Sequence, residues 1–191
     1  MPKLLRAISL DASDTYVFER AAAAGEWVVS GAFMFWDSDA RSLEGRAKQA
    51  FRAGFLGLTS FGWSTLAVVV DATDAEREQA VESLGSYLVE HHGAPSVDIA
   101  RAAAEDELSF AASLADHPVQ TLVAVHRTVT PDGEIYEQFR TFHAADAKQA
   151  AAMPCSAGAF SVVEDEQDAG MTYFDLAGTV AAQQTVRARK S

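Results

Sequence analysis

The sequence predicts an α+β fold, in which a mixed or mainly antiparallel sheet is covered by helices. Three observations lead to this class: strand-like apolar runs in the first third, helical patterns in the middle, and a β-hairpin at residues 121–143. The resulting order is β-rich, then α-β-α-α, then β, which favours a sheet with helices on one face.

The first third is expected to consist mainly of strands. Segments 4–10 and 15–18 are candidate strands, and the longer apolar run at 26–36 is too apolar for a solvated edge. That run therefore predicts a central strand. The acidic segment 37–39 is expected to cap a helix that runs to about residue 55, because acids suit the first turn.

The middle of the chain predicts a buried strand followed by two helices. The strand covers residues 64–70, and Thr73 and Glu76 behind it have the spacing of a capping box. The first helix is expected to end at Gly93, a residue type that suits the C-terminal cap. The second helix is expected from about residue 96 to 116, with alanines that let a neighbouring backbone approach closely.

The register of the hairpin follows from its turn, Pro-Asp-Gly at residues 131–133. The proline presets φ for a type I turn, and the glycine can take the left-handed conformation that closes a three-residue loop. This loop places Arg127 opposite Glu137 and Val125 opposite Phe139. A two-residue loop would pair apolar with charged residues, and such a slip is costly where one face is buried.

This register sorts the side chains of the hairpin onto two faces. The apolar face is expected to join the core and carries Val123, Val125, Val129, Ile135 and Phe139. The other face carries His126, Thr128, Tyr136, Gln138 and Arg140, with Leu122 and Phe142 at its open end. The second face is amphipathic, and it is where we expect a site.

The C-terminal part is expected to contain a short helix and two further strands. Residues 144–153 are alanine-rich and end before a proline, which predicts the helix. Residues 158–164 and 171–176 predict the strands, joined by an acidic loop at 164–168.

Residues 1–176 are expected to form a single domain, long enough for one well-buried core. The only candidate subdomain boundary is the Gly-Ala-Pro segment at 93–95, because no linker rich in glycine, serine or proline occurs. Residues 177–191 are expected to form a flexible tail.

Charge and composition exclude several classes of partner. The 15 basic and 27 acidic residues give a net charge of −12, which argues against a nucleic-acid or anionic-membrane surface. The single cysteine excludes an internal disulfide, and no apolar run approaches the ~20 residues that span a bilayer. No signal peptide is evident at the N-terminus, so we expect a cytoplasmic protein.

The strongest candidate site is the polar hairpin face, with His126, Tyr136, Gln138 and Arg140. Arg140 could bind a carboxylate through two hydrogen bonds, while His126 and Tyr136 supply a titratable group and a hydroxyl. The alternative is an ordinary polar sheet face with a cross-strand contact between histidine and glutamine. No catalytic residue, metal ligand set or cofactor is predicted.

Other reactive residue types have simpler explanations. Cys155 lies on an expected loop, where a half-buried side chain is favoured over a reactive thiol. His91 and His92 are adjacent at a helix end, where neighbouring side chains point about 100° apart, so they do not predict a metal site. Glu107 falls near the apolar stripe of its helix, and a buried carboxylate there would have a raised pKa. Pairing of Glu107 with an arginine is favoured over catalysis.

Aromatic residues are concentrated in the first third of the chain. Most of them should be core, and an exposed subset could form a homodimer surface, because aromatics dominate interface hot spots. The residues concerned are Trp27, Phe33, Phe35, Trp36, Phe61 and Trp63.

Four segments of the chain resemble a small, uncharacterised bacterial family. They are residues 10–20, 31–36, 51–57 and 110–118, which read LDASDTYVFER, GAFMFW, FRAGFLG and FAASLADHP. The family has no assigned activity, so the resemblance implies an accessory role and transfers no catalytic residue.

The leading hypothesis is a non-enzymatic, cytoplasmic accessory or binding protein that forms a homodimer and binds a protein partner or a small ligand. The first alternative is an enzyme or metabolite-binding protein that acts on a small carboxylate or phosphate at the His126 and Arg140 face. The second alternative is an acidic scaffold whose loop at 164–168 docks a basic partner.

Overall fold

The computed structural model describes residues 1–8, 14–144, 160–161 and 167–168. Its strands are β1 Lys3–Ile8, β2 Trp27–Val29, β3 Phe55–Gly57, β4 Trp63–Ser64, β5 Leu66–Asp71, β6 Leu122–Val129, β7 Ile135–Ala144, β8 Phe160–Ser161 and β9 Gln167–Asp168. Its helices are α1 Asp14–Val17, the 3-10 helix η1 Ala32–Phe35, α2 Gly45–Ala53, α3 Asp74–His91 and α4 Val97–Leu114.

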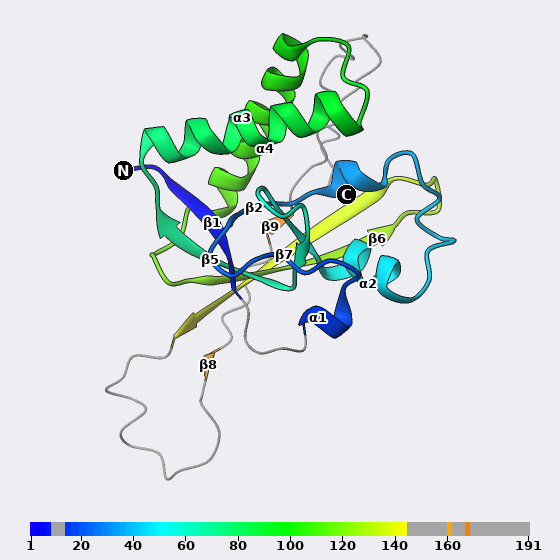
Figure 1. Ribbon diagram of the computed structural model, residues 1–191. Helices are drawn as coiled ribbons and strands as arrows, with labels where there is room; N and C mark the ends of the chain where they lie inside the picture. Colours follow the sequence, from blue (N-terminus) through cyan, green and yellow to red (C-terminus); the bar gives the residue numbers. More distant parts are fainter. Residues whose placement is uncertain (9–13, 145–159, 162–166, 169–191) are drawn as a thin grey trace, which may run out of the picture.

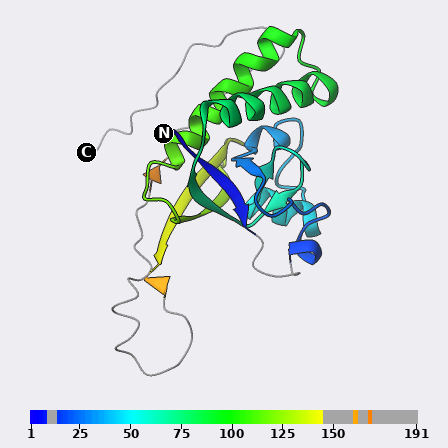
Figure 2. The ribbon, with the colours of Figure 1, turned by 60° about the vertical axis from the view of Figure 1, so that its left-hand side comes forward.

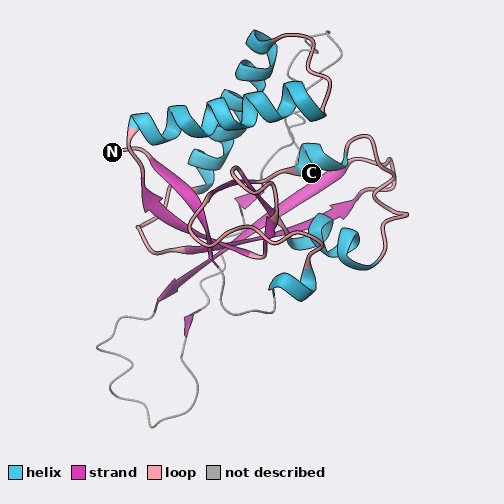
Figure 3. Cartoon of the chain, in the orientation of Figure 1, coloured by secondary structure: helices cyan, strands magenta, loops and turns pink. Residues whose placement is uncertain are grey.

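The strands form one twisted sheet in the order β4-β3-β2-β1-β5-β6-β7-β8, with β9 also paired to β7. Every pair of these strands is antiparallel. Helices α3 and α4 lie together over the sheet, while α1 and α2 lie away from them (Figures 1 and 3), and α2 packs against β6. Figure 2 shows the sheet beneath the helix pair from a second direction. The predicted α+β class is confirmed.

The central strand β1 is buried on both of its faces. Leu4 packs in a core with Leu84 of α3 and Leu108 of α4. The next residue, Leu5, points the other way and packs in a second core with Val28 and Phe139. Both leucines are at most 1 % exposed. The sheet is therefore covered on both faces here, and not only on the face where helices were expected.

The hairpin has the predicted register. Arg127 lies opposite Glu137, Val125 opposite Phe139, and Leu122 opposite Phe142. The three-residue loop closes with the Thr130 amide donating to the Glu134 carbonyl at 2.8 Å. Gly133 has φ 91°, the left-handed conformation that the turn requires.

Replacing Gly133 by alanine is expected to lower the free energy of unfolding by about 1 kcal/mol, because an L-residue resists this φ. The cost should come from the backbone alone, since the nearest atom to an added Cβ is the Arg41 side chain at 3.6 Å. Urea denaturation monitored by circular dichroism measures the change. Glu134→Ala, at an exposed neighbouring position, is the control and should leave the midpoint unchanged.

The two long helices are confirmed. Thr73 caps α3, with its hydroxyl accepting from the Glu76 amide while the Glu76 carboxylate accepts from the Thr73 amide. Gly93 follows α3 with φ 63°, as its expected place at the helix end requires. Ser96 caps α4 by accepting from the Ile99 amide.

Two predicted strands in the first third are wrong in whole or in part. Residues 15–18 belong largely to α1, because Val17 and Phe18, adjacent in sequence, both pack into a third core. The expected strand 26–36 ends at Val29, since Gly31 has φ 74° and the following residues form η1.

The helix expected from residue 39 begins only at Gly45, with Glu44 at its N-cap. Asp39 instead caps a preceding turn, where its carboxylate accepts from the Arg41 amide at 3.1 Å. The short strands β3 and β4 were not predicted, and the strand expected at 64–70 is divided between β4 and β5.

Beyond the hairpin, the structure describes only β8 and β9. Strand β8 lies within the predicted strand 158–164, whereas β9 occupies the end of the predicted acidic loop and pairs with β7. The expected helix at 144–153, apart from its first residue in β7, and the expected strand 171–176 and tail 177–191 lie outside the described residues.

Candidate functional site

The structure places the four predicted site residues on one exposed face of the hairpin. His126 lies opposite Gln138, and Tyr136 and Arg140 occupy alternate positions on either side of Gln138 in β7. His126, Tyr136 and Arg140 are exposed, while Gln138 is half-buried. This arrangement follows from the period-two alternation of a strand, and it brings together the residues that the sequence grouped.

A fifth residue, Arg52 in the last turn of α2, lies near enough to His126 for its charge to act on the imidazole. Strand β5 pairs with β6 over residues 122–124 and no further along β6. Helix α2 packs against β6. Burial lowers the pKa of His126 below its ordinary value, and the positive charges of Arg52 and Arg140 lower it further. We call His126, Tyr136, Gln138, Arg140 and Arg52 the outer site.

The sequence does not predict Arg52 as part of this site, because nothing in the linear pattern shows where α2 docks. The outer site concentrates positive charge on a chain whose net charge is −12. Guanidinium groups bind carboxylates and phosphates through paired hydrogen bonds, and a neutral histidine, a phenol and an amide add donors. The arrangement can therefore hold a small anion against the sheet.

Behind the outer site, on the opposite face of β6, lies a buried arginine. Arg127 is only 1 % exposed, and protein groups accept the hydrogen bonds of its guanidinium. Its Nη1 donates to the carbonyls of Phe51 at 3.0 Å and Gly54 at 2.8 Å, at the C-terminus of α2. Its Nη2 donates to the Ser30 carbonyl and to the Ser30 hydroxyl, the latter at 3.2 Å.

The remaining donor of Arg127, Nε, binds Glu137 Oε1 at 2.6 Å. The Ser30 hydroxyl donates to the same oxygen at 2.5 Å. A guanidinium has five N–H donors, and all of them have partners here. Arg127 therefore joins α2, the end of β2 and β7, and has no donor left for a ligand.

A second carboxylate, Glu107 of α4, lies near this arginine. Its Oε1 accepts from the Gly31 amide at 3.1 Å. Burial raises the pKa of Glu107 to about 7, and the charge of Glu137 adds to the rise, while the Gly31 hydrogen bond and Arg127 oppose it. Among the described residues, the salt bridge of Arg127 is with Glu137. Arg127 lies near enough to Glu107 for its charge to act on that carboxyl. The direct pairing expected between Glu107 and an arginine is therefore not formed with Arg127.

Other candidates from the sequence carry no ligand geometry. In the described ranges, no three His, Cys, Asp or Glu side chains converge in a way that could hold a metal ion. His91 and His92 both lie against the ring of Tyr87, with centroids 4.7 and 5.4 Å away. Cys155 lies outside the described residues.

Comparison with known protein families assigns most of the chain to one family. A family model described as a family of unknown function, DUF6505, covers residues 1–157. No curated protein and no solved structure shows significant similarity to the chain. In the part of the chain that the structure describes, no helix has the length and apolar character needed to cross a bilayer.

Proposed function

The chain belongs to DUF6505, a family of unknown function, and from this premise we propose that it is a non-enzymatic binding protein. Its ligand is a small carboxylate or phosphate, held at the outer site. The compartment that fits its single cysteine is the cytoplasm.

One observation carries the proposal: on an exposed face of a strongly acidic chain, His126 lies diagonally across the hairpin from Arg140, and the charge of Arg52 also acts on it. Arg140 comes from β7 and Arg52 from α2, and both act electrostatically on His126. Positive charges that gather on a surface attract small anions and raise their local concentration there. A small carboxylate or phosphate is the kind of ligand that such a surface favours.

The contrast between the exposed outer site and the buried Arg127 favours binding over catalysis. The side chain best placed to polarise a substrate in a dry environment is Arg127, and its donors are all used by the fold. The outer site is open to solvent, and water weakens the electrostatic stabilisation on which most catalysis depends. Recognition of an anion needs no such dry environment.

The proposal predicts that inorganic phosphate or citrate raises the melting temperature of the protein. At tenfold excess over the dissociation constant, one site should give about 1.4 kcal/mol, or about 3–6 °C for a chain of this size. Differential scanning fluorimetry at constant ionic strength measures the shift. Arg52→Ala and Arg140→Ala should each remove most of it.

Arg46→Ala is the matched control, because Arg46 is exposed at the other end of the same helix as Arg52. This variant should respond to phosphate and citrate as the wild type does. A wild type without a shift, or equal shifts in all three variants, would contradict the proposal. Turnover of a phosphate ester or carboxylate ester, lost in Arg140→Ala, would favour the enzyme alternative.

A further inference from the structure

A row of aromatic rings crosses the surface on the side of α3. Phe61 stacks on Tyr87 with centroids 3.7 Å apart and planes 10° from parallel. Tyr87 contacts His92 at 5.4 Å, His92 contacts Phe33 at 5.6 Å, and Phe33 contacts Trp36 at 6.4 Å. We call these five rings the aromatic ladder.

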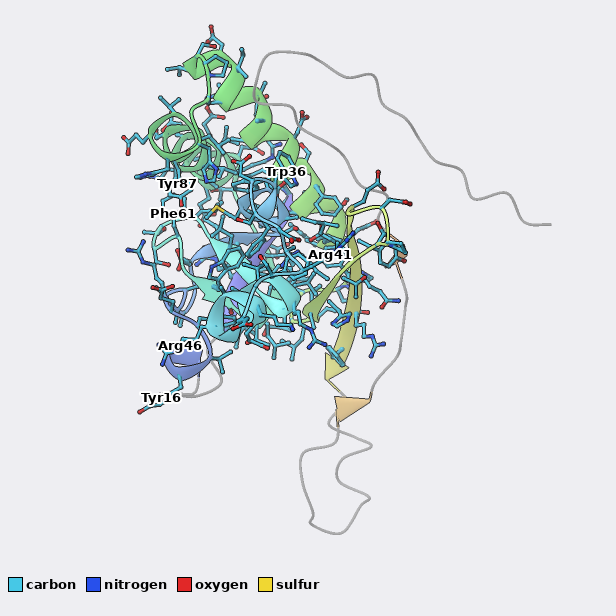
Figure 4. The ribbon with its side chains drawn as sticks, turned by 90° about the vertical axis from the view of Figure 1, so that its right-hand side faces the viewer. Tyr16, Trp36, Arg41, Arg46, Phe61 and Tyr87 are labelled. Carbon is cyan, nitrogen blue, oxygen red and sulfur yellow. The ribbon has the colours of Figure 1, made fainter. Side chains whose placement is uncertain are left out.

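The ladder is assembled from three separate parts of the chain: the β3–β4 loop, the end of α3, and η1 with its C-cap. Figure 4 shows Phe61 and Tyr87 side by side, with Trp36 on the same side of the molecule. Phe33 is buried beneath, while the other four rings are only partly buried. Tyrosine and tryptophan rings that are apolar on one side and partly open to water on the other are enriched at protein interfaces.

The loop that carries Phe61 is held in a costly conformation. Phe61 has φ 51°, which is rare for a bulky residue. The buried carboxylate of Glu26 fixes this loop by accepting from the amides of Thr59 at 2.7 Å and Ser60 at 2.8 Å. Strain of about 1–3 kcal/mol is retained where the surroundings enforce it, often at sites of function. Here the result is that the Phe61 ring lies on Tyr87.

Opposite charges flank the two ends of the ladder. Arg20 lies at the Phe61 end, where its Nη1 donates to the Ser60 carbonyl at 3.1 Å and its charge acts on Tyr87. Asp37 follows Trp36 at the other end, and its charge acts on His92. Both charged residues are exposed. A surface with a cation at one end and an anion at the other is complementary to itself after a half-turn.

We infer that the aromatic ladder is the contact between two copies of this chain, related by a twofold axis. In this arrangement Arg20 of each copy meets Asp37 of the other, and the partly open rings of both copies pack between these two ion pairs. A twofold contact must be self-complementary. Two chains that each carry a net charge of −12 repel each other. Two opposite-charge pairs within the contact offset this repulsion, which favours a second copy over an unrelated acidic partner.

Light scattering after size exclusion tests this inference on the full chain. The wild type should elute with twice the chain mass of 20.4 kDa at micromolar concentration. Arg20→Asp and Asp37→Arg should each dissociate at concentrations at least about tenfold higher than the wild type, because each places two like-charge pairs in the contact. Both residues are exposed, so neither change should unfold the chain.

Mixing the two variants gives the sharpest result. An equimolar mixture of Arg20→Asp and Asp37→Arg chains restores both opposite-charge pairs, so dimers should return. The double variant Arg20→Asp/Asp37→Arg should also dimerise by itself. Neither rescue is expected if the two residues lie in different contacts or in none.

Tyr16 and Arg46 provide the controls, because both are exposed and lie at the opposite end of the molecule from Tyr87 (Figure 4). Tyr16→Ser and Arg46→Asp should leave the mass unchanged. A wild type that keeps the mass of one chain at high concentration overturns the inference. So do single variants that remain fully dimeric, or a mixture that stays monomeric.

Discussion

Replacing Arg127 by methionine is expected to lower the free energy of unfolding by about 3–5 kcal/mol. The change leaves the carboxylate of Glu137, which is 7 % exposed, without its cation. It also leaves the carbonyls of Phe51 and Gly54 at the end of α2 without donors. Removing one partner of a buried ion pair is costly because the other charge stays in a medium of low dielectric.

Chemical denaturation at pH 7 measures this loss, and two further variants locate its cause. Arg127→Lys keeps the charge but cannot reach all of the acceptors, so it should also destabilise the protein. Arg127→Met/Glu137→Met removes both charges and should cost much less than Arg127→Met alone. Arg46→Met, at an exposed position on α2, should change stability by less than about 0.5 kcal/mol. If Arg127→Met were equally mild, the buried network would not hold α2.

Replacing Glu107 by glutamine is expected to stabilise the protein at pH 8 by up to about 3 kcal/mol, with little effect below pH 5. The pKa of Glu107 is raised from 4.5 to about 7 in the folded protein. The folded state therefore binds this proton more tightly than the unfolded state. The resulting stability is complete below pH 4.5 and is lost as the pH rises through 7. Glutamine mimics the protonated acid and should remove this loss.

Urea denaturation of wild type and Glu107→Gln at several pH values between 5 and 8.5 tests the sign. The difference in unfolding free energy should grow with pH and level off above about pH 7.5. Asp106→Asn is the control, because Asp106 is the exposed neighbour on the same helix. A constant difference across this range would show that Glu107 does not titrate near neutrality.

The hairpin shows how far the sequence leads. A proline and a glycine in one short turn determined the loop, and the loop determined every cross-strand pair. The same register places Arg127 and Glu137 on the face of Val125, yet their burial could not be predicted. It depends on the carbonyls at the end of α2 and on Ser30, which come from distant parts of the chain.

The errors in the first third have a related cause. An apolar run such as residues 26–36 is compatible with a strand or with a chain that turns between two cores. Gly31 decides between them, because an added Cβ would lie 2.5 Å from Leu56 Cβ and φ is positive. The outer site follows the same rule: its four hairpin residues came from local alternation, whereas Arg52 depends on the docking of α2.

The position of α2 has a consequence for solubility. Strand β6 extends past the end of its pairing with β5, and there its backbone N–H and C=O groups lie along an edge of the sheet. Helix α2 packs against this strand. An uncovered strand edge is a template for pairing between molecules and for aggregation. Undocking of α2 would thus expose this edge to other molecules and promote aggregation. Arg127 opposes it, because its hydrogen bonds to the carbonyls of Phe51 and Gly54 hold the end of α2 against β6.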